Sequence, residues 1–145
     1  VLACDLVVAS TTSRFGLPEV TIGVIPTCAG LFRAPNAWPL NLARELILTG
    51  RPISAERAYG MGFVNVLTEA GEALDAAVTM ATQICENAPL SVQACLAAVD
   101  DLLSNNDERG WELTEHASAV LRDTEDRKEG VRAFLEKRRP VWSGR

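Results

Sequence analysis

The chain has 145 residues, of which 48% are hydrophobic, and this is enough for an ordinary domain with a hydrophobic core. Charged residues make up 23% of the chain and give a net charge of −5 at pH 7, which argues against a surface for nucleic acid. Any phosphate-rich ligand would therefore need local basic residues, and the run Glu136-Lys137-Arg138-Arg139 is the obvious candidate. No apolar run approaches the length of a membrane span, so no membrane partner is predicted.

The cysteine and histidine content predicts neither a disulfide framework nor a metal site. The four cysteines form no CxxC pair, and Cys85 and Cys95 fall in apolar helical patterns in which a free cysteine acts as a small hydrophobe. The single histidine argues against a zinc site. We therefore expect a reduced, cytoplasmic protein.

Residues 1–70 predict short strands and helices in alternation. Leu6–Ala9 is an uninterrupted apolar run, typical of a strand that is buried on both faces. Ser54 fits the N-cap of a short helix that follows it. The elements expected in this part besides that strand are the end of a helix over Val1–Cys4, a short strand over Arg14–Gly16, a helix over Leu31–Ala34 that Pro35 stops, a helix over Leu40–Leu48, a helix over Ala55–Tyr59 and a strand over Phe63–Leu67.

Residues 71–145 predict helices alone. Apolar residues recur at helical spacing in three successive patterns, and Pro89 marks the start of the second. A fourth helix is expected to begin at Asp126, because Glu129 three residues later completes a capping-box pattern. We therefore predict a sub-domain boundary at residues 68–71, between a mixed α/β part (1–70) and a helical part (71–145). The apolar positions of the three patterns are Leu74, Val78, Ala81 and Cys85, then Val92, Leu96, Val99 and Leu103, then Leu113, Ala117, Val120 and Leu121.

The segment Phe15–Pro26, FGLPEVTIGVIP, places one acid, Glu19, in an apolar stretch. Burying a charged carboxylate in apolar surroundings is costly, because desolvation disfavours its charged form. Such a group is paired, faces solvent after all at the start of a strand, or serves as a general acid or base. The spacing alone leaves these alternatives open.

Four segments, in this order, resemble the second half of the enoyl-CoA hydratase/isomerase (crotonase) family: LACDLVVAS, FGLPEVTIGVIP, ELILTGRPISAERAYGMGFVNVL and EDRKEGVRAFLEKRRPVW. The resemblance implies an α/β fold, in which part of a crotonase-like ββα spiral core is followed by an all-α C-terminal helical sub-domain. It also implies about as much sequence again before Val1, and a homotrimer or hexamer that assembles through the helical part.

The same resemblance implies that the protein hydrates the double bond of an acyl-CoA thioester. Glu19 matches the second of two catalytic glutamates, while the first glutamate and the two backbone donors to the enolate oxyanion are expected before Val1. We therefore expect little activity from these 145 residues alone. Pro18 and Ile22 would line the acyl pocket, with simple packing as the alternative, and no cofactor is implied beyond the coenzyme A that the substrate carries. An isomerase, which needs only one carboxylate, and a non-catalytic acyl-CoA-binding or assembly protein are the alternatives.

Pro26–Gly30, PTCAG, resembles a family turn that is usually richer in glycine. A backbone amide of that turn helps to hold the water, and Thr27 occupies the corresponding position. A threonine there excludes a positive φ unless the backbone is strained. The alternative is an ordinary loop that opens the next helix.

Phe134 and Lys137 lie three residues apart on the predicted last helix, and therefore on one face. By resemblance, the matching pair contacts the coenzyme A of a neighbouring subunit, with the lysine as a point charge for phosphate and the phenylalanine near the nucleotide. The alternative is a solvated basic helix end, which the helix dipole also favours.

Overall fold

A computed structural model describes residues 1–104 and 107–145 of the chain. Apart from the first two residues, the chain forms two compact units, and each unit combines two segments that are distant in sequence. The first unit contains residues 3–15 and 53–108, and the second contains residues 16–52 and 109–145. Each unit thus contains residues from before and after the predicted sub-domain boundary at residues 68–71. The boundary itself stays a prediction.

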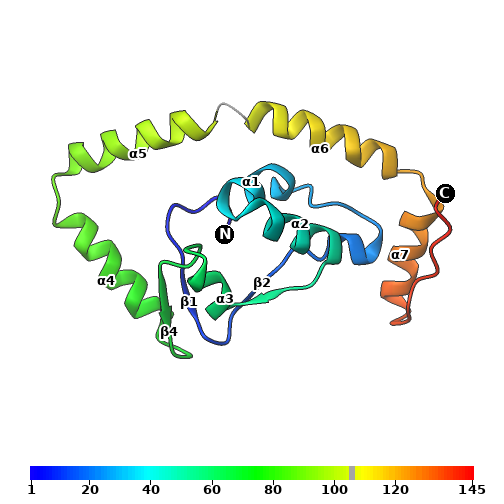
Figure 1. Cartoon of the computed structure of the whole chain (residues 1–145), viewed down its shortest axis with the longest axis horizontal. Helices are drawn as coiled ribbons and strands as arrows, with labels where there is room; N and C mark the ends of the chain where they lie inside the picture. Colours follow the sequence, from blue (N-terminus) through cyan, green and yellow to red (C-terminus); the bar gives the residue numbers. More distant parts are fainter. Residues whose placement is uncertain (105–106) are drawn as a thin grey trace. The chain divides into compact units, whose positions relative to one another are not determined.

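The strands of the first unit form two short pairs (Figure 1). Strand β1 (Val8–Ser10) pairs in parallel with β4 (Val66–Thr68), so that Ala9 lies opposite Leu67. Strand β2 (Arg14–Phe15) pairs antiparallel with β3 (Ile53–Ser54). The first strand begins two residues later than expected from the apolar run, because Leu6 is 44% exposed and lies outside the pairing. Val1–Cys4 forms a turn and not the end of a helix.

Three helices belong to the first unit: α3 (Ala55–Gly60), α4 (Ala73–Cys85) and α5 (Pro89–Ser104). The Ser54 hydroxyl caps α3 by accepting a hydrogen bond from the Arg57 backbone N–H at 3.3 Å, which confirms the predicted cap. Helix α4 packs on β1 and β4. Cys85 and Cys95, which fall in the apolar patterns of these helices, are both free and exposed. The large apolar side chains that α4 and α5 also expose include Leu74, Val78, Leu90, Leu96, Val99 and Leu103.

The second unit contains a 3₁₀ helix and α-helices from two segments that are distant in sequence. The elements are η1 (Glu19–Ile22), α1 (Gly30–Ala37), α2 (Leu40–Thr49), α6 (Asp107–Leu121, of which 109–121 lie in this unit) and α7 (Glu125–Leu135). Helix α1 packs against α2, and both α2 and α7 contact η1. The core of α1 and α2 consists of Ala34, Trp38, Leu42, Ala43 and Leu46.

Helix α1 continues past Pro35, where the sequence predicted its end. A proline removes one backbone hydrogen bond inside a helix, and here the helix stops two residues later, at Ala37. The last turn still closes, because the Trp38 backbone N–H donates to the Ala34 carbonyl at 2.9 Å. Both Ala34 and Trp38 are buried, so the packing of this turn outweighs the bond that the proline removes.

Candidate active site

Glu19 is the first residue of η1, so the alternative of an acid at the start of a strand does not hold. The turn is closed by the Pro18 carbonyl, which accepts hydrogen bonds from the Thr21 backbone N–H at 2.9 Å and from the Thr21 hydroxyl at 2.7 Å. Gly23 ends the turn with a φ of 73°, a left-handed conformation that favours glycine. The proline and glycine on either side of Glu19 thus produce a tight turn that fixes the backbone of this residue.

The Glu19 carboxylate is partly buried and is not fully satisfied. Its Oε2 atom is inaccessible to solvent and has no hydrogen-bond partner among the described residues. Leaving a buried polar atom without a partner is costly, and such atoms in folded proteins are rare. Because Oε2 is closed to solvent, it exchanges a proton with a bound molecule only after the side chain or its neighbours move.

Glu19 lines a hollow of about 380 Å³ in the second unit, which we call the Glu19 hollow. Its volume lies within the range of small-molecule pockets. Its wall combines apolar, hydroxyl and guanidinium groups, and Glu19 is the one acid among the described residues that line it. The lining residues are Glu19, Val24, Ile25, Thr27, Ser118, Leu121, Arg122 and Arg127.

Part of the wall comes from residues distant from η1 in sequence, at the end of α6, the start of α7 and the junction between them. Thr124 caps α7, since its hydroxyl oxygen accepts a hydrogen bond from the Arg127 backbone N–H at 3.2 Å and its O–H donates to the Leu121 carbonyl at 2.9 Å. The Arg127 guanidinium donates to the Arg122 carbonyl at 2.7 Å and fixes the junction further. The predicted capping box is therefore wrong: the helix begins one residue before Asp126, and Thr124 is its cap.

Close backbone contact between α7 and η1 sets the position of Glu19. Gly130 is buried in α7, and a Cβ atom there would overlap the carbonyl group of Ile22. On the other side of the contact, a Cβ atom at Gly23 would lie 2.8 Å from the Asp126 carbonyl oxygen. The two glycines thus allow the helix to lie directly against the turn that carries Glu19.

The other predicted acyl-site residues take different places. Thr27 lines the Glu19 hollow, and its φ is not positive; the left-handed residue of this turn is Ala29, with a φ of 64°. The strain expected at Thr27 therefore does not arise. Pro18 is exposed and forms the turn before Glu19, while half-buried Ile22 lies at the contact with Gly130. Neither Pro18 nor Ile22 lines the hollow, so their roles in the acyl pocket stay predictions.

Phe134 and Lys137 do not share a helix face. Helix α7 ends at Leu135, and Lys137 lies beyond it with a left-handed φ of 53°. Phe134 is 68% exposed near the helix end. Neither residue lines the Glu19 hollow, which leaves their contact with coenzyme A as a prediction.

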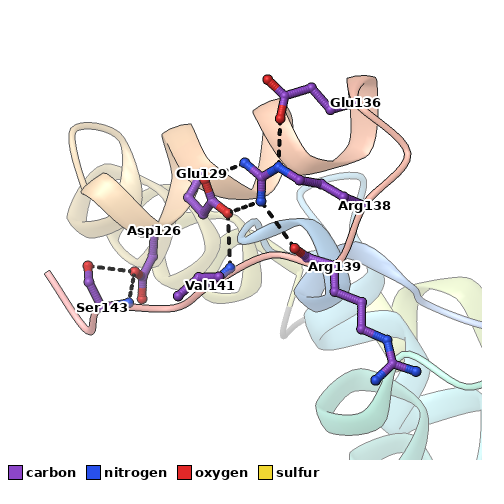
Figure 2. Close-up of polar contacts among 7 residues, drawn as sticks. All are labelled: Asp126, Glu129, Glu136, Arg138, Arg139, Val141 and Ser143. Atoms are coloured by element: carbon purple, nitrogen blue, oxygen red, sulfur yellow. Dashed lines mark hydrogen bonds and ion pairs between the residues drawn. The ribbon is translucent and has the colours of Figure 1, made fainter.

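The residues after α7 fold back along the helix through two carboxylates (Figure 2). Glu129 accepts hydrogen bonds from the Arg138 guanidinium at 2.5 and 2.9 Å and from the Val141 backbone N–H at 2.9 Å. Asp126 accepts from the backbone N–H groups of Ser143, at 2.6 Å, and Gly144, at 2.9 Å. This C-terminal clasp, formed by Asp126, Glu129 and residues 138–144, explains why the chain turns at Lys137 and does not continue the helix.

The clasp is expected to open only in strong acid. The hydrogen bonds from Arg138 and Val141 lower the pKa of Glu129 from 4.5 to about 2. A lowered pKa in the folded state contributes stability that is complete above pH 4.5 and is lost as the pH falls towards about 2. In an NMR titration, the Val141 amide resonance should therefore shift with a midpoint near pH 2. A midpoint near 4.5 would contradict the clasp, and the shift should disappear in the Glu129→Gln variant.

In the described part of the chain, no group of three or more His, Cys, Asp and Glu side chains is arranged to hold a metal ion. Among residues 1–104 and 107–145, no helix has the length and hydropathy needed to cross a membrane.

Comparison with known proteins identifies the family. The model of the enoyl-CoA hydratase/isomerase family matches residues 1–145. The chain belongs to this family. A similar hydratase-family protein is a probable mitochondrial enoyl-CoA hydratase of Arabidopsis thaliana, which is 40% identical over 99% of this chain and 48% of its own length. A carnitinyl-CoA dehydratase of Salmonella paratyphi A is 36% identical over 99% of this chain and 57% of its own length.

A solved structure shows the same fold. The carnitinyl-CoA dehydratase of Mycobacterium avium 104 superimposes with a TM-score of 0.93 and 48% identity, over 99% of this chain and 57% of its own length. The predicted family and the predicted crotonase fold with a helical C-terminal part are thus confirmed. The chain spans about half the length of the curated relatives it matches. Below, "the whole protein" means this chain with any sequence joined to it.

Proposed function

We propose that the whole protein is an enoyl-CoA hydratase that uses Glu19 as a general acid or base. The observation that carries this proposal is the buried Oε2 atom of Glu19, which has no hydrogen-bond partner among the described residues and belongs to a residue that lines a ligand-sized hollow. The names of the relatives support a hydratase or dehydratase, which are the two directions of one reaction.

In hydration, a water oxygen bonds to the β-carbon of the enoyl group, and one of its protons passes to a base. A proton is delivered to the α-carbon, so that one molecule of water is added across the double bond. Glu19 carries one of these two proton transfers. The apolar side chains of Val24, Ile25 and Leu121 in the wall of the hollow suit an acyl chain. No cofactor is required beyond the coenzyme A of the substrate.

An isomerase is the second candidate, because it needs a single carboxylate to move a proton along the acyl chain. Glu19 as the one acid in the described wall of the hollow is compatible with that chemistry. The two reactions differ in their products. Mass spectrometry of crotonyl-CoA incubated with the whole protein should detect the gain of one water, as hydration requires. Conversion of a 3-enoyl-CoA to a 2-enoyl-CoA without that gain would favour the isomerase, and neither product would favour the non-catalytic alternative.

Lys137→Ala in the whole protein is expected to raise KM for a short enoyl-CoA by roughly three- to tenfold and to change kcat little. The reason is that a contact with a phosphate far from the double bond stabilises the ground state and the transition state alike. Steady-state kinetics measure both constants. Lys128 is the control, because its ammonium group already pairs with Glu125 at 2.7 Å, and its replacement by alanine should leave KM unchanged. An equal KM for the unaltered protein and both alanine variants would mean that Lys137 does not contact the coenzyme A.

A homotrimer or hexamer and a cytoplasmic location are the remaining parts of this proposal. Self-association would cover the large apolar side chains that α4 and α5 expose in this chain, as would the sequence expected before Val1. Phe134, exposed at the end of α7, is available for the proposed contact with a neighbouring subunit's substrate.

A further inference from the structure

We propose that Arg122 makes the site selective for acyl-CoA substrates whose acyl group ends in a carboxylate. This inference rests on the proposed function, because it takes the Glu19 hollow as the acyl site. Arg122 follows the last residue of α6, Leu121, and lines the same hollow as Glu19.

The charges of the hollow support an anionic ligand. The described residues that line it include one acid, Glu19, and two arginines, Arg122 and Arg127. The guanidinium of Arg127 is engaged, because it donates to the Arg122 carbonyl at 2.7 Å. The guanidinium of Arg122 has no ion pair and no side-chain hydrogen bond within the described residues. The described lining residues therefore carry one net positive charge, and Arg122 is an exposed arginine without a protein partner for its guanidinium among the described residues.

The chemistry of arginine favours a carboxylate as the partner. A guanidinium presents parallel N–H donors that bind a carboxylate with two hydrogen bonds, and such charge-assisted bonds are stronger than neutral ones. The apolar side chains of Val24, Ile25 and Leu121 line the same hollow as the two charged groups, Glu19 and Arg122. The wall thus offers an acid for the reacting carbons, apolar surface for the chain and a cation for its end.

Phosphates of coenzyme A are also anions that arginine can bind. We assign Arg122 to the acyl end because it shares one hollow of about 380 Å³ with Glu19, whose proposed target is the double bond next to the thioester. The phosphates are separated from that thioester by the whole pantetheine arm. The experiment distinguishes the two sources, since every acyl-CoA has the same phosphates and only some have a terminal carboxylate.

The test measures binding, so that it does not depend on turnover. Glutaconyl-CoA and pentenoyl-CoA have acyl chains of equal length that end in a carboxylate and in a methyl group, respectively. Calorimetry gives the Kd of each for the whole protein in a Glu19→Gln background, with and without Arg122→Leu. We expect Arg122→Leu to weaken glutaconyl-CoA roughly 10- to 100-fold and to change pentenoyl-CoA less than about threefold. Arg109→Leu is the matched control, because Arg109 already pairs with Glu112 at 2.8 Å on exposed α6, and it should change neither Kd.

Equal weakening of both ligands would assign Arg122 to the phosphates or to the structure and overturn the proposal. No change for either ligand would overturn it as well. A loss of affinity for glutaconyl-CoA alone supports the proposal, even if the whole protein shows no hydration. In that case the hydratase proposal fails and the carboxylate site remains.

Discussion

Replacing Glu19 with glutamine is expected to lower kcat for a short enoyl-CoA by roughly 10²–10⁴-fold in the whole protein, while Kd changes little. Glutamine keeps the size of the side chain and its ability to form hydrogen bonds, but it cannot exchange the proton that hydration requires. The group that is lost is the ionisable carboxylate of Glu19. Steady-state kinetics give kcat, and calorimetry with the substrate analogue butyryl-CoA gives the change in binding.

Glu115→Gln is the control for this experiment. Glu115 is an exposed acid on α6 and does not line the hollow, so its replacement should leave kcat within about twofold. If Glu19→Gln keeps most of its kcat, Glu19 is a structural acid of the turn and the catalytic assignment is wrong.

Gly130→Ala is expected to lower the free energy of unfolding by about 3 kcal/mol. The added methyl group would overlap the carbonyl of Ile22, and a backbone atom cannot rotate away as a side chain can. Either α7 or η1 must move, and Glu19 is the first residue of η1. We therefore also expect kcat to fall, since a displacement of about 1 Å can cost roughly 100-fold in rate. Urea unfolding and steady-state kinetics of the whole protein measure the two effects.

Gly60→Ala is the matched control, because Gly60 also lies in a helix and a Cβ atom there meets nothing within 4 Å. Alanine is the better helix former, so this variant should be unchanged or slightly more stable. Equal stabilities of the Gly130→Ala variant and the unaltered protein would mean that α7 does not lie directly against η1.

The sequence predicted the helix over α2 to within one residue, but the strand that it allowed as one alternative at Glu19 is a 3₁₀ turn. The β-branched residues Val20, Thr21 and Ile22 favour a strand. Pro18 and Gly23 close a turn instead, and the packing of α2 and α7 on that turn comes from distant parts of the chain. Local propensity does not contain such long-range packing.

The hollow could not be predicted for the same reason. Ser118, Leu121 and Arg122 reach Glu19 only because residues 16–52 and 109–145 fold into one unit. Thr124 was a local signal that the sequence did offer, since a threonine before two acids is a common helix start. The capping-box pattern of Asp126 and Glu129 competed with this signal in the sequence. In the structure both carboxylates instead bind the returning chain, at Ser143 and Val141.

The most direct test of the central claim is the position of the acyl group in a crystal structure of the whole protein. The Glu19→Gln variant, bound to a 3-hydroxyacyl-CoA, would hold the product without turnover. We expect the acyl group in the Glu19 hollow, with its hydroxyl oxygen or its α-carbon within about 3.2 Å of the side chain of residue 19 or separated from it by one water. An acyl group bound outside the hollow, with both reacting carbons beyond that reach, would contradict the role of Glu19 in catalysis.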